Sequence, residues 1–283
     1  MSKVGLSLML VFCSLLAFGQ TKRIDGVYGE DNRYESFERP QTYALAQSVA
    51  AQIHSGFFHF NSQGKIEITE IVTLKEEFKL CEGVRFGNQP ILASCSGALV
   101  SEDLILTAGH CVQQRTDCRD FFWVFGYEMS KNGAAKEIGA ENIYSCTKIE
   151  RKVYNGYADY ALIRLDRPVR ARTPLKVAAA NYRSKKGDDI FMIGYPSGLP
   201  LKTTEAAKVT GFEGNSFLSN LDAFAANSGS PVFNSQTKEI VGVLIAGDED
   251  YTMTRNQCSV ISKYPESGSG EEVLSVHVVP RIF

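Results

Sequence analysis

Tryptophan and histidine are scarce in this 283-residue chain, which has one Trp and four His, and no Cys-x-x-Cys pair occurs. Zinc sites are usually built from closely spaced cysteines and histidines, so this scarcity argues against a metal centre. The formal net charge of -2 at pH 7 is close to zero and indicates no basic surface of the kind that binds nucleic acid. We therefore expect no metal, no cofactor and no nucleic-acid partner.

Long apolar runs are also rare, and the longest one lies at the start of the chain. Lys3 precedes an apolar run of fifteen residues, Val4 to Phe18, which ends in Ala17-Phe18-Gly19. This run is shorter than the roughly 20 residues that span a bilayer, and small residues at 17 and 19 suit signal peptidase. The pattern predicts a signal peptide over residues 1–19 and a secreted protein, extracellular or periplasmic, that leaves the membrane after cleavage. A retained membrane anchor is the alternative.

Helix-length amphipathic segments are missing as well, which excludes a parallel sheet built from βαβ units. Short apolar stretches separated by turn residues take their place and predict an all-β sandwich or barrel. The expected strands are Ser48 to His54, Ile66 to Leu74, Ile91 to Val100, Leu104 to Thr107, Phe121 to Tyr127, Ala161 to Leu165, Asp189 to Gly194, Ala207 to Gly211, Ser230 to Phe233 and Ile240 to Ala246.

Six cysteines follow the predicted signal peptide, and an even number in an exported chain is typical of disulfides rather than metal ligands. We expect three bridges among them. They are Cys81, Cys95, Cys111, Cys118, Cys146 and Cys258.

The first chemical motif delivers a histidine at the end of an apolar strand. The run Leu104-Ile-Leu-Thr-Ala-Gly-His110-Cys111 follows Cys95-Ser96-Gly97, and Cys95 lies sixteen positions before Cys111. A single histidine in a turn is uninformative, but this combination resembles the histidine region of trypsin-like serine peptidases. The resemblance implies that His110 is the catalytic base and that Cys95 and Cys111 form a disulfide beside it.

Two further motifs follow in the order of that family. Asp159 opens the strand Asp-Tyr-Ala-Leu-Ile-Arg-Leu, and Asp166-Arg167-Pro168 follows it. The loop Asn227-Ser-Gly-Ser-Pro231 resembles the nucleophile loop of the bacterial V8-like branch, which includes glutamyl endopeptidases. The resemblance implies that Asp159 orients the histidine and that Ser228 is the nucleophile. The order His, Asp, Ser also differs from the Ser, Asp, His order of α/β-hydrolases.

The resemblance carries expectations for fold and function. It implies two antiparallel six-stranded β-barrels with the active site between them, and a secreted serine endopeptidase that acts on proteins or peptides as a monomer. The peptidase domain is expected over residues 42–261, with the barrel boundary near 166–180. Residues 20–41, which are polar, are expected to form an N-terminal arm or propeptide, and residues 262–283 a C-terminal loop and tail.

Substrate preference and the oxyanion hole rest on the same resemblance. Asp222, six residues before Ser228, occupies the position at the base of the trypsin pocket, and implies a preference for Arg or Lys before the cleaved bond. Ile245 and Gly247 are expected to line that pocket. The oxyanion hole would use the backbone N–H groups of Ala226 and Ser228, although the family normally has glycine at position 226. That departure supports the alternative of a weakened or inactive secreted binding module.

Four cysteines remain for three possible pairings. We prefer Cys118 with Cys146, which would staple the loop after the histidine. Cys81 with Cys258 would then tie the N-terminal part of the domain to the C-terminal barrel.

Overall fold

The computed structural model describes residues 26–60, 66–69, 71–112, 117–247 and 250–281. The predicted signal peptide and the first residues of the predicted arm lie outside the described residues. Among the described residues, none of the helices has both the length and the hydrophobicity that a bilayer span requires.

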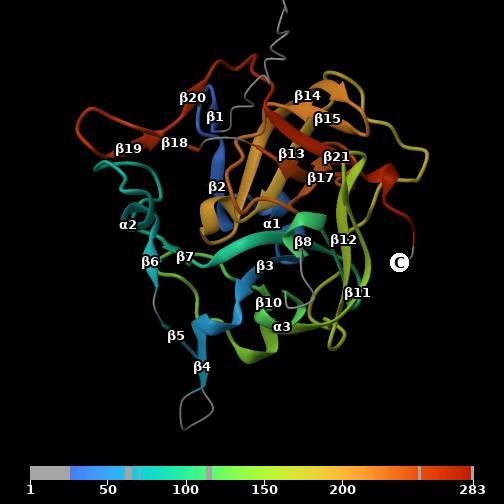
Figure 1. Ribbon diagram of the computed structural model, residues 1–283, viewed down its shortest axis with the longest axis horizontal. Coiled ribbons are helices and arrows are strands. Elements are labelled where there is room, and N and C mark those ends of the chain that lie inside the picture. Colours follow the sequence, from blue (N-terminus) through green and yellow to red (C-terminus); the bar gives the residue numbers. More distant parts are fainter. Residues whose placement is uncertain (1–25, 61–65, 70, 113–116, 248–249, 282–283) are drawn as a thin grey trace, which may run out of the picture.

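Antiparallel strands of the first half of the chain close into a barrel, which lies below the second barrel in Figure 1. The strands pair around the ring in the order β10, β11, β12, β9, β8, β3. Their bounds are β3 Val49–His54, β8 Ala93–Ser101, β9 Leu104–Thr107, β10 Phe121–Phe125, β11 Ile143–Asn155 and β12 Ala158–Leu165.

The second half of the chain forms another closed ring, in the order β13, β16, β17, β21, β15, β14, with β14 pairing back to β13. The bounds are β13 Asp189–Gly194, β14 Lys202–Glu213, β15 Ser216–Ser219, β16 Pro231–Asn234, β17 Ile240–Ala246 and β21 Glu271–Ser275. The prediction of an all-β fold with two antiparallel six-stranded barrels is therefore confirmed.

Burial explains why the central strands read as apolar runs in the sequence. All four residues of β9 are buried, and β9 pairs with β8 on one side and β12 on the other. A strand that contacts other elements on both faces needs apolar side chains at successive positions rather than at alternate ones. The same holds for β12, of which only Arg164 is not fully buried.

The described N-terminal residues, from Gly26 onward, belong to the folded body, which corrects the prediction of a polar arm. β1 (Val27–Tyr28) pairs with β20 (Lys263–Tyr264), and β2 (Arg33–Glu35) pairs with β14 at the edge of the second barrel. The helix α1 (Pro40–Ala46) leads directly into β3. One of the charged side chains that suggested an arm is buried in an ion pair, because Arg33 has no exposed surface and binds Asp31 through two side-chain hydrogen bonds.

The predicted C-terminal tail also belongs to the fold, and the predicted domain boundary at residue 261 is wrong. β21 lies between β17 and β15 and closes the second barrel. This strand is not evident in the sequence, because a Gly- and Ser-rich run, residues 265–270, precedes it and the strand itself begins with two glutamates. A short 3-10 helix, η6 (Val276–Val278), follows β21.

Smaller helices and strands lie outside the two barrels. The predicted strand Ile66 to Leu74 is two short strands, β5 and β6, rather than one. It also ends one residue earlier than predicted, because a capping box between Thr73 and Glu76 starts a helix at Leu74. Long β11, short β15 and β21 were not predicted. The peripheral elements are β4 Phe58–Phe60, β5 Ile66–Ile68, β6 Val72–Thr73, α2 Leu74–Phe78, β7 Pro90–Ile91, α3 Asp117–Asp120, β18 Tyr251–Met253 and β19 Ser259–Ile261.

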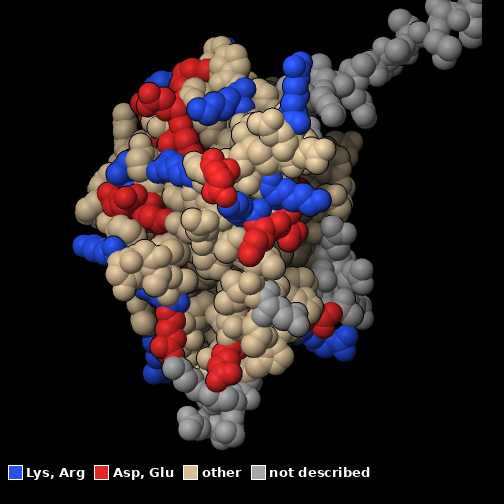
Figure 2. Space-filling view, turned by 90° about the vertical axis from the view of Figure 1, so that its left-hand side faces the viewer, with Lys and Arg blue, Asp and Glu red and all other residues tan. Residues whose placement is uncertain are grey.

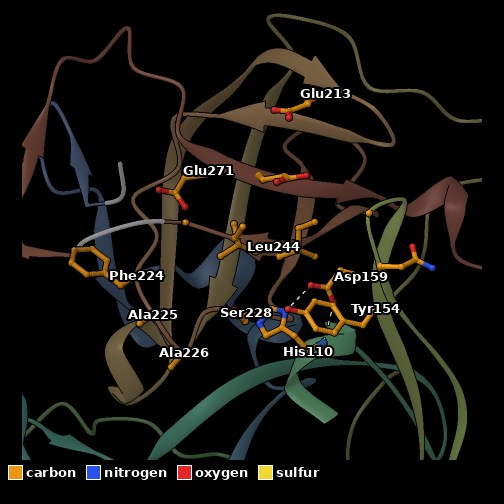
Figure 3. A pocket seen from close by; sticks show the side chains of 16 residues that line it. His110, Tyr154, Asp159, Glu213, Phe224, Ala225, Ala226, Ser228, Leu244 and Glu271 are labelled. Atoms are coloured by element: carbon orange, nitrogen blue, oxygen red, sulfur yellow. Dashed lines mark hydrogen bonds and ion pairs between the residues drawn. The ribbon is translucent and has the colours of Figure 1, made fainter. Parts of the chain in front are cut away.

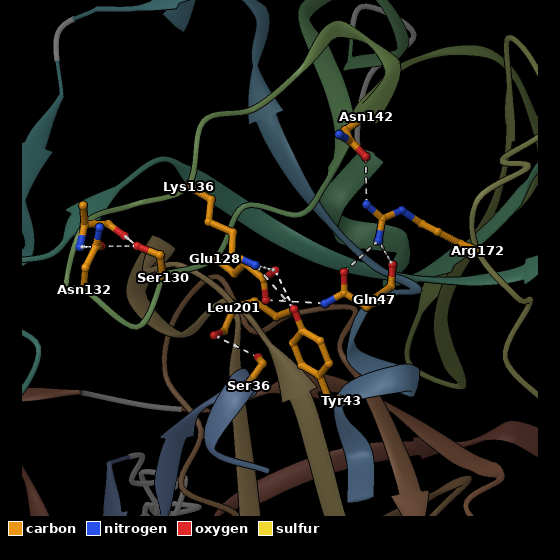
Figure 4. Close-up of polar contacts among 11 residues, drawn as sticks. Ser36, Tyr43, Gln47, Glu128, Ser130, Asn132, Lys136, Asn142, Arg172 and Leu201 are labelled. Atoms are coloured by element: carbon orange, nitrogen blue, oxygen red, sulfur yellow. Dashed lines mark hydrogen bonds and ion pairs between the residues drawn. The ribbon is translucent and has the colours of Figure 1, made fainter. Parts of the chain in front are cut away.

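A polar network fixes α1 against the first barrel (Figure 4). The hydroxyl of Tyr43 donates to Glu128 Oε1 at 3.0 Å, and Lys136 Nζ donates to the same oxygen at 2.7 Å. Arg172, in the connection between the barrels, donates to Asn142 Oδ1 at 2.8 Å and to the backbone carbonyl of Gln47. The N-terminal helix, the first barrel and the connection are thereby joined by hydrogen bonds to charged groups, which are stronger than neutral ones.

Three disulfides cross-link the described chain, and they are the predicted pairs. Cys95–Cys111 joins β8 to the turn that holds the histidine, Cys118–Cys146 joins α3 to β11, and Cys81–Cys258 links segments 177 residues apart. Figure 2 shows acidic and basic side chains interspersed on one face of the molecule. Charges mixed in this way on that face do not form a patch of one sign.

Candidate active site

His110 lies in a 3-10 turn, η3 (Gly109–Val112), just after the buried strand β9. The turn is pressed against neighbouring backbone, because a Cβ atom at Gly109 would come within 2.1 Å of the carbonyl oxygen of Val153. Only glycine fits such a close approach. The sequence Ala-Gly-His-Cys therefore places the imidazole at the edge of the first barrel, facing the second.

Asp159 binds both the backbone and the ring of His110. Its Oδ1 accepts the backbone N–H of His110 at 2.9 Å, and its Oδ2 lies 2.6 Å from His110 Nδ1. The carboxylate belongs to β12, which pairs with β9, so neighbouring strands hold the two residues together. Only 7% of Asp159 is exposed. A buried carboxylate in this position fixes the proton on Nδ1 and leaves Nε2 able to accept another.

Ser228 lies in a tight loop that leads into β16 and is bonded to the first barrel. The backbone N–H of Ser96 donates to the carbonyl oxygen of Ser228 at 2.8 Å. The next residue, Gly229, has φ of +85°, and a Cβ atom there would come within 2.1 Å of the carbonyl oxygen of Ser96. The glycine of Asn-Ser-Gly-Ser-Pro is thus required for contact between the barrels.

His110, Asp159 and Ser228 line one pocket of about 690 Å³ between the barrels. Figure 3 shows the His110 ring between Ser228 and Asp159. The Ser228 hydroxyl does not hydrogen-bond to the imidazole in this arrangement, although both line the pocket. Catalytic hydrogen bonds are often long before substrate binds. The arrangement can supply a nucleophile, a base and a carboxylate that orients the base.

The turn before Ser228 has an unusual backbone conformation at the position where the family has glycine. Ala226 has φ of +63°, in the left-handed region that alanine enters only at a cost. The backbone N–H groups of Ala226 and Ser228 donate to none of the described residues. Both N–H groups are therefore candidates for the two donors that an oxyanion hole needs, and the turn that carries them, residues 225–228, is called the oxyanion turn below.

Three hydrogen bonds hold this turn in place. The Ala225 N–H donates to Asp250 Oδ2 at 2.9 Å, and the Ala225 carbonyl accepts from the Ser197 N–H at 2.6 Å. The Ala226 carbonyl accepts from Ser96 Oγ at 3.0 Å. Because a trans peptide directs its C=O and N–H in opposite directions, fixing the Ala225 carbonyl also fixes the Ala226 N–H. These contacts offset the strain of alanine at a positive φ.

A family model described as a trypsin-like peptidase domain matches residues 95–243, which include His110, Asp159 and Ser228. The chain belongs to this family.

Solved structures agree with the two-barrel fold of a trypsin-like peptidase. Human heparin binding protein aligns with a TM-score of 0.54 and 14% identity, over 89% of this chain and 92% of its own. The VesB protease of Vibrio cholerae aligns with a TM-score of 0.52 and 14% sequence identity, over 87% of this chain and 64% of its own length. An inactivated protease paralogue of the scabies mite aligns with a TM-score of 0.50 and 15% sequence identity, over 88% of this chain and 94% of its own length. At these identities the likeness shows the fold alone.

Within this trypsin-like peptidase, the Asp222 carboxylate is bonded to the N-terminal segment of the chain. Its Oδ1 accepts the Tyr28 N–H at 2.8 Å and its Oδ2 accepts the Asn32 N–H at 2.7 Å. Asp222 is not among the residues that line the pocket. The prediction that it binds a basic substrate side chain is therefore not supported, because its carboxylate holds the N-terminal segment. Burial raises the pKa of Asp222 to about 7, although the two N–H donors oppose that shift.

The other predicted pocket residues, Ile245 and Gly247, do line the pocket. Sequence reasoning missed several residues there, and the missed acidic ones are Glu213, Glu271 and Glu272. It also missed Ser96, Ser197 and Asp250, which hold the oxyanion turn. An acidic pair at the start of β21 was the available signal, but its meaning depends on recognising β21 as a strand.

Ligand atoms of Cys95, His110 and Cys111 lie within 4.8 Å of one another, the spacing of a metal site. The two sulfurs are joined in a disulfide, however, and thiolates are needed to bind a metal. This cluster is therefore not a metal centre.

Proposed function

We propose that this trypsin-like peptidase is a serine endopeptidase that cleaves proteins or peptides as a monomer, with His110, Asp159 and Ser228 as its catalytic triad. The observation that carries the proposal is the pair of hydrogen bonds between Asp159 and His110, 2.9 Å from the backbone N–H and 2.6 Å from the ring Nδ1, in the pocket that Ser228 also lines. An aspartate placed for solubility or strand ending would not contact both groups of one histidine.

In the proposed mechanism, Ser228 Oγ attacks the carbonyl carbon of the scissile bond while His110 Nε2 accepts the hydroxyl proton. Asp159 stabilises the imidazolium that forms. The backbone N–H groups of Ala226 and Ser228 bind the negatively charged carbonyl oxygen, and His110 then gives its proton to the leaving amine. Water, activated by His110, releases the acyl group from Ser228.

The rival is an inactive secreted binding module, an idea prompted by alanine at position 226. Proteins named as an inactivated protease paralogue and as a heparin binding protein share the fold, so the fold does not decide between the two. The conformation of Ala226 favours the enzyme, because φ of +63° and the hydrogen bonds of the turn leave its N–H available to an oxyanion.

A fluorophosphonate probe tests the proposal, because it labels a serine only where a base and an oxyanion hole activate it. The mature, disulfide-bonded protein should be labelled at Ser228, and Ser228→Ala should not be labelled. Ser230→Ala is the matched control, since Ser230 lies two residues away and is buried. Peptide mapping locates the label, and a correctly oxidised protein that takes up no probe would favour the binding module.

We further propose that the protein is secreted through a signal peptide over residues 1–19. The three disulfides support this, because such bonds persist in oxidising compartments. N-terminal sequencing of protein recovered from the medium or periplasm should begin after Gly19, and a chain that retains Met1 in the membrane fraction would contradict the proposal.

A further inference from the structure

Phe224 lies directly before the oxyanion turn and is hydrogen-bonded to it. Its backbone carbonyl accepts the Asn227 N–H at 3.0 Å, which closes a β-turn with Ala225 and Ala226 at its centre. Ala226, at the third position, has the positive φ that glycine usually supplies there, so the turn depends on contacts from outside. In Figure 3 Phe224, Ala225 and Ala226 follow one another along one side of the pocket. A contact that fixes the Phe224 side chain therefore fixes one end of the turn.

The guanidinium of Arg33 lies on the ring of Phe224. The Arg33 Cζ atom is 3.9 Å from the centroid of the ring, which is the distance of a close cation–π contact. Arg33 has no exposed surface, and only 3% of Phe224 is exposed. A cation–π contact is stronger where water is excluded. The Phe224 ring also lies against Tyr251, with 5.8 Å between the two ring centroids.

Asp31 holds the guanidinium in this place. Arg33 Nε donates to Asp31 Oδ1 at 2.9 Å, and Arg33 Nη2 donates to Asp31 Oδ2 at 2.8 Å. The third nitrogen, Nη1, is buried and donates to none of the described residues. Burying a charged donor is costly unless another group compensates. The aromatic rings of Phe224 and Phe86, 3.9 and 5.3 Å from Cζ, are the groups that face the guanidinium.

The backbone of Arg33 is fixed as well, because it belongs to β2. Within the pairing of β2 with β14, Arg33 lies opposite Thr204. β14 is a strand of the second barrel, which also carries the oxyanion turn. A side chain on a paired strand is held more precisely than one on a loop. The N-terminal segment thus reaches the turn through one buried side chain.

We propose that Arg33 is a positioning residue for the oxyanion turn, because its guanidinium fixes the Phe224 ring and thereby the turn that presents the Ala226 N–H. The proposal rests on the endopeptidase function, since the position of this turn affects catalysis only if the turn binds an oxyanion. Arg33 is not among the residues that line the pocket, so its effect passes through Phe224. The N-terminal segment is then part of the catalytic apparatus.

Arg85 provides a matched control on the same carboxylate. Arg85 Nη1 lies 3.2 Å from Asp31 Oδ1 and donates to the Asp31 carbonyl at 2.9 Å. Its guanidinium faces the rings of Phe86 and Tyr34, with Cζ 4.5 and 5.6 Å from their centroids. Replacing either arginine removes one positive charge from Asp31. Only the replacement of Arg33 removes the contact with Phe224.

Hydrogen–deuterium exchange tests the proposal without requiring catalysis. In a peptide that contains residues 224–228, the N–H groups of Ala225 and Asn227 are hydrogen-bonded and should exchange slowly. Arg33→Met should speed this exchange about tenfold, the order of effect of one desolvated cation–π contact, while a peptide from β9 exchanges as in the wild type. Arg85→Met should leave the exchange of both peptides unchanged. Equal exchange of residues 224–228 in the wild type and Arg33→Met would overturn the proposal.

Kinetics per active site distinguishes positioning from a loss of folded protein. Saturating fluorophosphonate counts the active serines in each preparation. Arg33→Met should lower kcat per labelled serine about tenfold with KM changed less than about threefold, because an oxyanion hole acts mainly on the transition state. Arg33→Lys keeps a cation near the ring and should recover part of the rate. Fewer labelled serines with an unchanged kcat for each would show a role in stability alone and would overturn the proposal.

Phe224→Leu keeps the proposal testable if Arg33→Met fails to fold, because it removes the ring and leaves the ion pair of Arg33 with Asp31 in place. It should speed the exchange of residues 224–228 to a similar extent, and unchanged exchange would overturn the proposal. Where both variants fold, the double variant should exchange little faster than either single one, since both remove the same contact. A wild type that takes up no fluorophosphonate would instead contradict the endopeptidase function, and the exchange measurement would still decide whether Arg33 holds the turn.

Discussion

The two barrels build their parts of the site in different ways. In the first barrel, His110 and Asp159 come from neighbouring elements, and one carboxylate holds both the backbone and the ring of the histidine. In the second barrel, the turn before Ser228 is held by residues from distant segments, including Ser197 and Asp250. In the first barrel the two residues are brought together by strands that pair directly, β9 and β12, whereas the turn of the second barrel is held by residues that lie outside the strands of the ring. Both kinds of contact join residues far apart in the chain, 49 positions for His110 and Asp159 and 25 for Ala225 and Asp250.

Two buried aspartates express this difference. Asp159 faces the candidate active site and binds His110, while Asp222 faces the N-terminal segment and binds the N–H groups of Tyr28 and Asn32. Both are acidic residues near a motif of the family. Their hydrogen-bond partners, rather than their distance along the chain from a motif, distinguish the proposed catalytic role of Asp159 from the structural contacts of Asp222.

The largest effect is expected at Asp159, where Asp159→Asn should lower kcat about 10⁴-fold with little change in stability. An amide presents an N–H group to Nδ1 and favours the wrong histidine tautomer. Steady-state kinetics on a peptide substrate measures the loss. Asp166→Asn is the control, since Asp166 lies on the same barrel but binds the Ser145 N–H outside the pocket. Similar kcat values for the two variants would contradict a catalytic role for Asp159.

At Asp222, the expected effect is on stability. Because the pKa of Asp222 in the folded protein, about 7, exceeds the ordinary value of 3.8, the folded protein binds more protons than the unfolded chain between these pH values. The free energy of unfolding should therefore fall as pH rises from about 4 to about 7, by at most about 1.4 kcal/mol per pH unit, and level off above. Below pH 4 the contribution of this group is fully present.

Urea unfolding at a series of pH values checks this contribution by comparison with Asp222→Asn, which does not titrate. The difference in unfolding free energy between wild type and variant should change across the window from pH 4 to 7 and stay constant above it. Parallel curves for the two proteins would show that Asp222 has the same pKa in both states.

A smaller effect on rate is expected from Asp250→Ala, which removes the acceptor for the Ala225 N–H. The oxyanion turn should loosen, and kcat should fall about tenfold with a smaller change in KM, less than the loss of a whole oxyanion donor. Asp250→Asn retains an oxygen acceptor and should recover most of the rate. If the two variants lose the same activity, charge rather than the hydrogen bond is responsible.

The smallest effect is expected at Ala226. Ala226→Gly removes the strain of a positive φ but adds flexibility to the unfolded chain, so the free energy of unfolding should rise by only roughly 0.5 kcal/mol. Turnover should stay within about threefold, since the hydrogen bonds already hold the turn. Thermal unfolding and kcat measure both, and a gain in rate of about 100-fold would mean that alanine disables the oxyanion hole.

The fold and the disulfide pairs could be predicted because their signals are local or few. Short buried strands leave apolar runs such as Leu104 to Thr107, and the three cysteine pairs were the preferred ones. His110, Asp159 and Ser228 lie in continuous motifs, so the sequence was sufficient to propose them, and the structure brings them to one pocket.

The rest depended on contacts that the sequence does not display. The spacing of Asp222 from Ser228 carried no information about Tyr28 and Asn32, which lie 194 and 190 residues away in the chain. Glu271 was hidden because a strand that starts with two glutamates after a Gly- and Ser-rich run looks like part of a polar tail. Its place in the lining of the pocket depends on the pairing of β21 with β15 and β17, which the sequence does not display.

The late position of β21 also bears on how the protein is made. This strand closes the ring between β17 and β15, yet it is synthesised more than forty residues after Ser228. Chains fold from the N-terminus as they emerge, and a barrel cannot close without its inner strand. A nascent chain that already contains His110, Asp159 and Ser228 therefore still has no closed second barrel. The molecule acquires its complete pocket only at the end of synthesis.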